Sequence, residues 1–233
     1  GNYFLGENIE GTGGIRISDS NHTITNNYIQ DCSTASSQAK WNNGITFIGG
    51  GDTSAVACTA ISMTNGYQKS NNITISNNSI VNTNAPLFFN TSKGSNDVTG
   101  LLSNNLIYFS DGNPNITDVI SGDATNAYTS MGTGLDYIGN IYSGTNLGVS
   151  NTGFSEESGI TATANGEVFT FSGTVLSGKG ADLGTYTPLT DDMVGNDIGA
   201  CFLNNLGDNI LDGDCSVQIG ETLNISNLPL LNP

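Results

Sequence analysis

The chain has 233 residues, with 21 Asp and Glu against five Lys and Arg side chains, which gives a formal net charge of −16. That charge argues against binding a nucleic-acid backbone, which needs clustered cations, and no run of about 18 apolar residues predicts a membrane-spanning helix. Asn, Gly, Ser and Thr dominate while good helix formers are scarce, so we expect an all-β chain. A hydrophobic content of 36% is too high for a disordered one.

A short motif recurs along the first 145 residues. Its pattern is an aliphatic residue, Ser or Thr, two Asn, any residue and Ile. Complete copies or near-copies stand at 23–29, 74–80 and 101–107, and partial copies stand at 1–4 and 139–142. The second Asn of the copies falls at Asn2, Asn27, Asn78, Asn105 and Asn140. These spacings predict a structural unit of roughly 25 residues, with the step from Asn27 to Asn78 counted as two units and a degenerate copy near 49–52.

A repeat of this length with short strands predicts a right-handed parallel β-helix, a solenoid whose coils stack their inward aliphatic side chains. The Asn is expected at a tight bend, where it tolerates the left-handed conformation and its amide bonds the same Asn one coil away. An antiparallel β-sandwich is the alternative; it explains the composition but not the recurring pair of Asn. Strands are expected at 14–18, 23–25, 44–47, 60–63, 73–76 and 101–109.

The pattern changes near residue 145, so we expect β-helix coils over 1–145 and the last coils with a C-terminal capping extension over 146–233. Residues 166–172 alternate like one strand with an exposed face, and 187–192 could start a short helical turn. The chain begins inside a repeat, with no polar covering segment before it. We therefore expect further coils before Gly1, either in a longer protein or as a separate chain.

Four cysteines, Cys32, Cys58, Cys201 and Cys215, form no Cys-x-x-Cys pair. They are either buried thiols or one or two disulfides, with Cys201 and Cys215 the better pair. The acidic, Lys-poor composition favours a secreted or periplasmic bacterial protein.

The run from Gly1 to Ile29 resembles the middle of polysaccharide lyase family 6, which holds alginate lyases and the dermatan sulfate lyase chondroitinase B. The shared features are Gly-Asn-x-Phe-x-Gly, a short loop, Gly-Gly-Ile-Arg and then His-x-[Val/Ile]-x-Asn-Asn-Tyr. Residues 60–66 and 186–195 are similar to later stretches of the family. The resemblance covers 1–145 well and the remainder loosely.

The resemblance implies β-elimination on a uronic acid. In the family, Ca²⁺ held by Asn and Glu neutralises the sugar carboxylate, a Lys acts as general base and an Arg acts as general acid. All of these residues lie before the Gly-Asn-x-Phe motif. No catalytic residue is therefore carried over to this chain, and the Ca²⁺ ligands are expected upstream of Gly1.

One substrate contact does carry over. Arg16, the only Arg in the chain, matches a family arginine that lines the cleft, and a guanidinium suits a uronate carboxylate. The alternative is an outward Arg16 paired with Asp19. His22 matches the family's His position, although a lone His at a strand start is more often structural. Lys40, Trp41 and Tyr67 are further candidates for the same groove, since aromatic rings stack on sugars and Lys attracts carboxylates; surface packing is their alternative.

Acidic side chains suggest weaker cation sites. Glu7 and Glu10 follow the first strand, and solvation is the simpler reading of both. Residues 111–118 place oxygen ligands at alternating positions, like a calcium loop without its bidentate Glu. Asp208, Asp212 and Asp214 form a further cluster beside Cys215.

These observations favour a polysaccharide lyase that acts on a uronate polymer, most of all alginate, because one Arg and four Lys are few for a sulfated polymer. The alternatives are a dermatan sulfate lyase, a non-catalytic β-helix that binds carbohydrate or serves as a scaffold, and a pectin-lyase-like adhesin module.

Overall fold

The computed structural model describes part of the chain, and the account below is confined to that part. The described residues are 2–7, 12–32, 43–50, 67–83, 85–91, 94, 96–110, 120–122, 132–143, 154–165, 168–173, 176, 202–203 and 209–211. Within these ranges every regular element is a β-strand. A search of the described residues for helices long and apolar enough to cross a membrane finds none.

Fourteen of the strands build three parallel sheets. Sheet 1 runs in the order β1 (Tyr3–Leu5), β4 (Tyr28–Gln30), β7 (Ser79–Val81), β10 (Leu106–Tyr108), β13 (Asn140–Ser143) and β14 (Phe154–Glu156). Sheet 2 contains β2 (Ile15–Ile17), β5 (Ile45–Ile48), β8 (Leu87–Asn90) and β11 (Ile120–Gly122). Sheet 3 contains β3 (Thr23–Thr25), β6 (Ile73–Ser76), β9 (Thr99–Ser103) and β12 (Gly134–Ile138).

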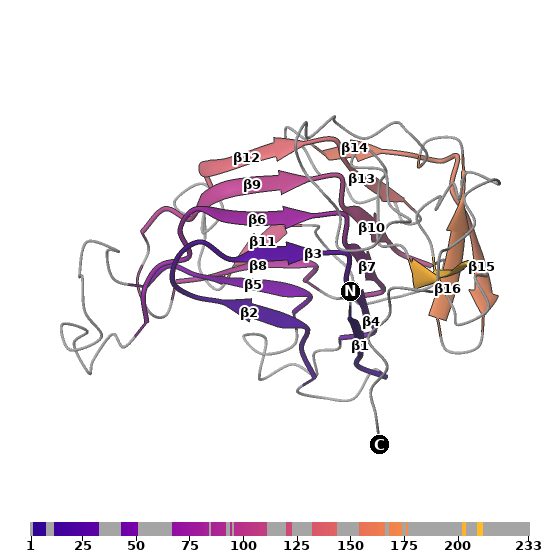
Figure 1. The fold of residues 1–233 in the computed structure, drawn as a ribbon, viewed down its shortest axis with the longest axis horizontal. Helices are drawn as coiled ribbons and strands as arrows, with labels where there is room; N and C mark the ends of the chain where they lie inside the picture. Colours follow the sequence, from indigo (N-terminus) through magenta and orange to yellow (C-terminus); the bar gives the residue numbers. More distant parts are fainter. Residues whose placement is uncertain are drawn as a thin grey trace, which may run out of the picture.

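The chain visits the three sheets in turn, so β2–β3–β4, β5–β6–β7, β8–β9–β10 and β11–β12–β13 are successive coils (Figure 1). Every pairing within the three sheets is parallel and joins one coil to the next. The predicted parallel β-helix is therefore confirmed, and an antiparallel sandwich is excluded for this region. The expected strand over 101–109 is two strands, β9 and β10, which meet at a corner.

Each corner between sheet 3 and sheet 1 is made by the repeated pair of Asn. The first member adopts a left-handed backbone, with φ of 56° at Asn26, 55° at Asn77 and 55° at Asn104. In the fourth coil Gly139 takes the same place with φ of 65°. Asn and Gly are the residues that enter this conformation most readily, so the chain can turn sharply without a longer loop. The predicted left-handed bend is thus at the first Asn of the pair.

The second Asn of each pair forms a buried ladder along the axis of the β-helix. Each side-chain amide donates to the side-chain oxygen of the next coil: Asn2 to Asn27 at 3.0 Å, Asn27 to Asn78 at 2.9 Å, Asn78 to Asn105 at 2.9 Å and Asn105 to Asn140 at 2.8 Å. The same oxygens also accept the backbone N–H of the preceding member, at 3.0 Å for the three inner steps. The predicted bond between equivalent Asn of neighbouring coils is confirmed.

The prediction that the 51-residue step holds two coils is wrong. Asn27 bonds directly to Asn78, and β4 pairs directly with β7. A single coil, built from β5, β6 and β7, spans the step, and its extra length lies between strands. Gly49, expected in a degenerate copy of the corner, instead follows β5 and forms an antiparallel bridge with Lys69. Insertions between strands leave the ladder intact because only the corner and the strand register repeat.

The interior is filled by columns of apolar side chains, one residue from each coil. In sheet 1 the column runs from Phe4 through Ile29, Ile80 and Ile107 to Tyr142, following the strand register. Columns of this kind are the main source of cohesion between coils, because burial of apolar area dominates folding. In sheet 2 the rings of Phe47 and Phe89 stack with centroids 4.8 Å apart.

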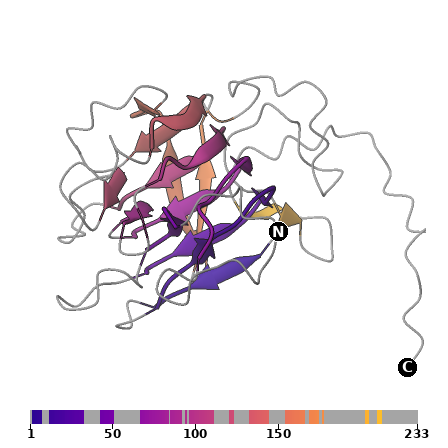
Figure 2. The ribbon, with the colours of Figure 1, turned by 90° about the vertical axis from the view of Figure 1, so that its left-hand side faces the viewer.

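Described residues of the C-terminal region form two antiparallel hairpins, β15 (Thr161–Asn165) with β16 (Val168–Ser172) and β17 (Phe202–Leu203) with β18 (Asn209–Leu211). The β15–β16 hairpin stands beside sheet 1 in both views (Figures 1 and 2). Phe171 packs there with a second apolar cluster that includes Tyr28, Val81 and Leu106, and the Phe169 N–H donates to the Tyr28 hydroxyl at 3.0 Å. This hairpin covers the outer side of sheet 1. Strand β16 agrees with the strand expected at 166–172.

Cys32 lies in the main core with 1% of its surface exposed, and it is a free thiol. Burial raises the pKa of this thiol to about 12, with Asp31 adding to the rise and a hydrogen bond with Thr83 opposing it. We expect Cys32 to resist iodoacetamide at neutral pH until the protein is denatured, because the thiolate is the nucleophile. Peptide mapping after alkylation in buffer and in urea tests this; fast modification of the folded chain would contradict it. Cys58, Cys201 and Cys215 lie outside the described residues.

Candidate functional site

Arg16 is the central residue of β2 and points away from the core. Its neighbours Ile15 and Ile17 pack against the apolar interior, so the alternation of a strand directs the Arg16 side chain to the outer face of sheet 2. The glycine before β2 is required by the close stacking of coils: a Cβ on Gly14 would collide with the carbonyl oxygen of Gly44 in the next coil. The Gly-Gly-Ile-Arg motif therefore combines a tight coil contact with an outward cation.

A short segment, Tyr67 to Ser70, runs across the ends of β2 and β5. The Ser70 hydroxyl donates to the Ile17 carbonyl at 2.8 Å and accepts the Ile48 N–H at 3.1 Å. The Asp19 N–H donates to the Gln68 carbonyl at 3.3 Å. These contacts join the segment to two coils at once, which places Tyr67 next to β2 although 51 residues separate Tyr67 from Arg16 in the sequence.

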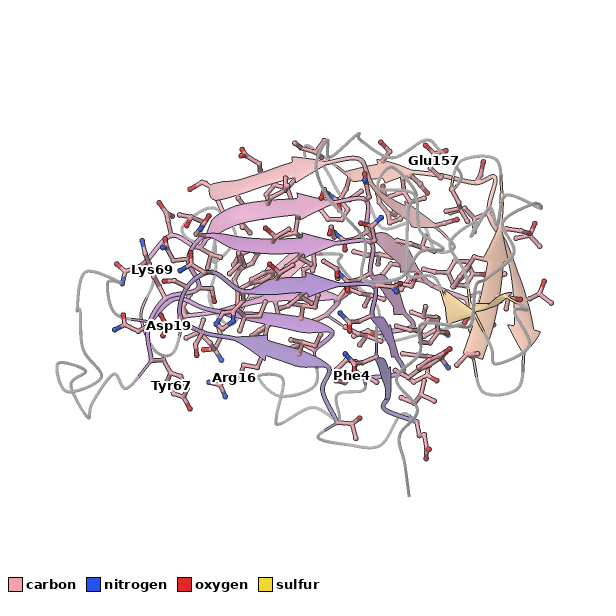
Figure 3. All side chains as sticks on the ribbon, viewed as in Figure 1. Phe4, Arg16, Asp19, Tyr67, Lys69 and Glu157 are labelled. Carbon is pink, nitrogen blue, oxygen red and sulfur yellow. The ribbon has the colours of Figure 1, made fainter. Side chains whose placement is uncertain are left out.

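The Arg16 guanidinium lies over the Tyr67 ring, with its central carbon 4.9 Å from the ring centroid. That geometry is a cation–π interaction, and it orients the guanidinium. The ring is 37% exposed, so the pair lies at the surface. Figure 3 shows Arg16, Tyr67, Asp19 and Lys69 in the left-hand part of the view, whereas Glu157 lies at the upper right.

His22 is exposed on the connection from β2 to β3, and its Nε2 lies 2.8 Å from the Ser18 carbonyl oxygen. The ring nitrogen donates this bond, so His22 closes its own turn. Asp19, on the same turn, accepts the Ser20 N–H at 2.8 Å with its carboxylate and has a positive φ of 74°. Both side chains thus have local structural contacts in the turn that precedes β3.

Of the five predicted substrate contacts, the structure brings Arg16 and Tyr67 together and places His22 on the turn that follows Arg16. Lys40 and Trp41 lie outside the described residues, as do the strand expected at 60–63 and the helical turn expected at 187–192. Glu7 is exposed, with φ of 53°. The other acidic candidates, Glu10, residues 111–118, Asp208, Asp212 and Asp214, lie outside the described part of the chain as well.

Among the residues that the structure describes, no group of three or more His, Cys, Asp and Glu side chains is placed to hold a metal ion. No step of the chemistry is derived through the Ca²⁺ that the family resemblance implies.

Lys69 was missed by the sequence analysis. It lies two residues after Tyr67 and is half-buried, and its backbone forms the bridge with Gly49 at the end of β5. No local sequence motif indicates it: the alternation along this segment, with Gln68 and Ser70 buried and Tyr67 and Lys69 more exposed, is seen only in the structure.

Comparison with known proteins finds similarities in sequence and in fold. Residues 1–113 match the sequence model of the chondroitinase B family. The structure is similar to that of the alginate lyase AlyGC of polysaccharide lyase family 6, with 22% sequence identity over 74% of this chain and a TM-score of 0.53. It is also similar to an arginine-to-alanine mutant of AlyGC, with 18% identity over 85% of this chain and a TM-score of 0.51.

The chain spans about a fifth of the length of these solved structures, 21% and 22% respectively. No curated protein matches its sequence. The chain is therefore similar to chondroitinase B in the sequence of residues 1–113, and its fold is the parallel β-helix of family 6 polysaccharide lyases.

Proposed function

We propose that this chain is part of a polysaccharide lyase that cleaves a uronate-containing polymer, most of all alginate, by β-elimination. The observation that supports this most directly is the outward Arg16, oriented by Tyr67, on a coil whose sequence resembles chondroitinase B. In this proposal Arg16 binds a uronate carboxylate through paired charge-assisted hydrogen bonds. The elimination itself would be carried out by residues that do not match positions of this chain.

Alginate is favoured over a sulfated polymer on grounds of charge. The chain has five Lys and Arg against 21 acidic residues, and recognition of the sulfate groups along a polymer would need more cationic side chains. The two kinds of comparison point to both substrates, since the sequence match is to chondroitinase B and the structural matches are to an alginate lyase. A dermatan sulfate lyase is accordingly the alternative substrate class. A secreted or periplasmic location fits either polymer.

The test is the ultraviolet absorbance of the unsaturated uronate product when the chain is mixed with alginate, dermatan sulfate or a neutral glucan, with and without Ca²⁺. We expect this chain to bind alginate and not the glucan; a rise in absorbance would show in addition that its own residues carry out the elimination. Binding by this chain without turnover agrees with the proposal, whereas binding without turnover by a longer protein that contains this chain would favour the non-catalytic carbohydrate-binding alternative. No binding to either acidic polymer would contradict the proposal.

A further inference from the structure

The segment from Tyr67 to Ser70 presents two side chains on one side. Gln68 and Ser70 are 9% and 0% exposed and point inward, and the hydroxyl of Ser70 bonds to the backbones of β2 and β5. Successive side chains of an extended segment point to opposite sides. Tyr67 and Lys69 therefore leave the segment on its outer side, and the contacts of Ser70 fix the backbone from which they project.

Two positively charged side chains, Arg16 and Lys69, lie on the same side of the molecule (Figure 3). Tyr67 is in contact with Arg16, and Lys69 follows Tyr67 by two residues on the same side of the segment. No described residue forms an ion pair or hydrogen bond with the Lys69 amine. The adjoining turn contains Asp19, whose carboxylate accepts the Ser20 N–H. The chain has five Lys and Arg against 21 Asp and Glu, so cationic side chains are few in it.

We propose that Lys69 is a second anion-binding residue, which together with Arg16 binds consecutive carboxylates of an acidic polysaccharide, and that Tyr67 is a positioning residue for Arg16. The inference rests on the proposed function. It assigns Tyr67 a different role from the stacking platform predicted from the sequence, since the Arg16 guanidinium covers one face of the ring. A polymer with one carboxylate on each sugar offers repeated charges to such a pair, whereas a monosaccharide offers one.

The test measures the affinity of the full chain for alginate oligosaccharides of defined length at several salt concentrations. We expect Lys69→Gln to weaken binding about two- to fivefold, as for an exposed ion pair, and to lower its salt dependence. Lys69→Arg should restore both. The matched control is Lys179→Gln, which changes the net charge equally.

The outcomes separate this inference from the proposed function. If the unaltered chain binds no alginate, both are wrong. If it binds alginate and Lys69→Gln leaves the affinity unchanged, or Lys179→Gln weakens it equally, only the role of Lys69 is wrong. The uronate monosaccharide, which has a single carboxylate, should show a smaller effect of Lys69→Gln than the oligosaccharides, and an equal effect would also contradict the joint role of Arg16 and Lys69.

The role of Tyr67 is tested by comparing Tyr67→Phe with Tyr67→Leu. Phe keeps the ring face under the guanidinium, so its affinity should stay near that of the unaltered chain, whereas Leu should weaken binding about two- to fivefold. Where turnover is measurable, the loss should appear in KM and not in kcat. If Tyr67→Phe is as weak as Tyr67→Leu, the hydroxyl and not the ring acts, and the positioning role is refuted.

Discussion

Replacing Asn78 by Ala should lower the free energy of unfolding by about 3 kcal/mol or more, because it leaves several buried polar groups without partners. The Asn78 oxygen accepts both the backbone N–H and the side-chain amide of Asn27, and its own amide donates to the side chain of Asn105. The same amide also bonds the carbonyls of Ile24 and Ser76. Asn78 is 0% exposed, so water cannot replace these contacts.

The measurement is urea unfolding followed by circular dichroism, with Asn2→Ala as the matched control. Asn2 stands at the outer step of the ladder, is exposed, and donates a single side-chain bond to Asn27. Its replacement should cost less than about 1 kcal/mol. Equal losses of unfolding free energy for the two variants would contradict the prediction, because they would mean that a buried Asn of the ladder stabilises the fold no more than the exposed Asn2 does.

Replacing Arg16 by Ala should lower kcat/KM on a polyuronate by more than about tenfold in a complete enzyme that contains this chain. In this chain alone, the same replacement should weaken the binding of uronate oligosaccharides. Truncating one partner of a hydrogen-bonded charge pair typically costs about 2 kcal/mol or more. Arg16→Lys keeps the positive charge but loses the planar guanidinium, so its kcat/KM should lie between those of the unaltered protein and of Arg16→Ala. Unchanged kinetics for Arg16→Ala would rule out the assignment to the substrate groove.

A separate measurement shows whether a loss at Arg16 reflects binding. Arg16 lies on the outer face of sheet 2 and is not part of the apolar columns, so its removal leaves those columns unchanged. The urea midpoint of Arg16→Ala should therefore stay close to that of the parent. A large drop in the midpoint together with lost activity would point to a folding defect instead.

Most of the fold could be predicted from the sequence because the β-helix repeats its chemistry locally. The pair of Asn recurs beside short aliphatic strands. The first Asn can adopt a left-handed backbone conformation, and the side chain of the second can hydrogen-bond to its equivalent one coil away. The error at the 51-residue step has the same origin. A count of residues treats inserted loops as repeats, whereas coils are defined by which strands hydrogen-bond, and β4 bonds directly to β7.

The candidate site was predicted only in part. Arg16 and Tyr67 were both proposed as substrate contacts from the sequence. Their contact with each other could not be predicted, because no sequence pattern around Tyr67 indicates that it lies next to β2. Lys69 was missed for the same reason. It has no motif of its own, and its position matters only because Ser70 attaches the segment to the ends of β2 and β5.

The sequence by itself therefore determined the all-β class, the stacked coils and the Asn corners, since each depends on residues close together in the chain and on a repeated hydrogen-bond pattern. Only the tertiary structure decided that one coil joins Asn27 to Asn78, and that a tyrosine lies against the single arginine. Those results depend on hydrogen bonds and ring contacts between residues about 50 positions apart, across insertions whose length the stacking of coils does not restrict.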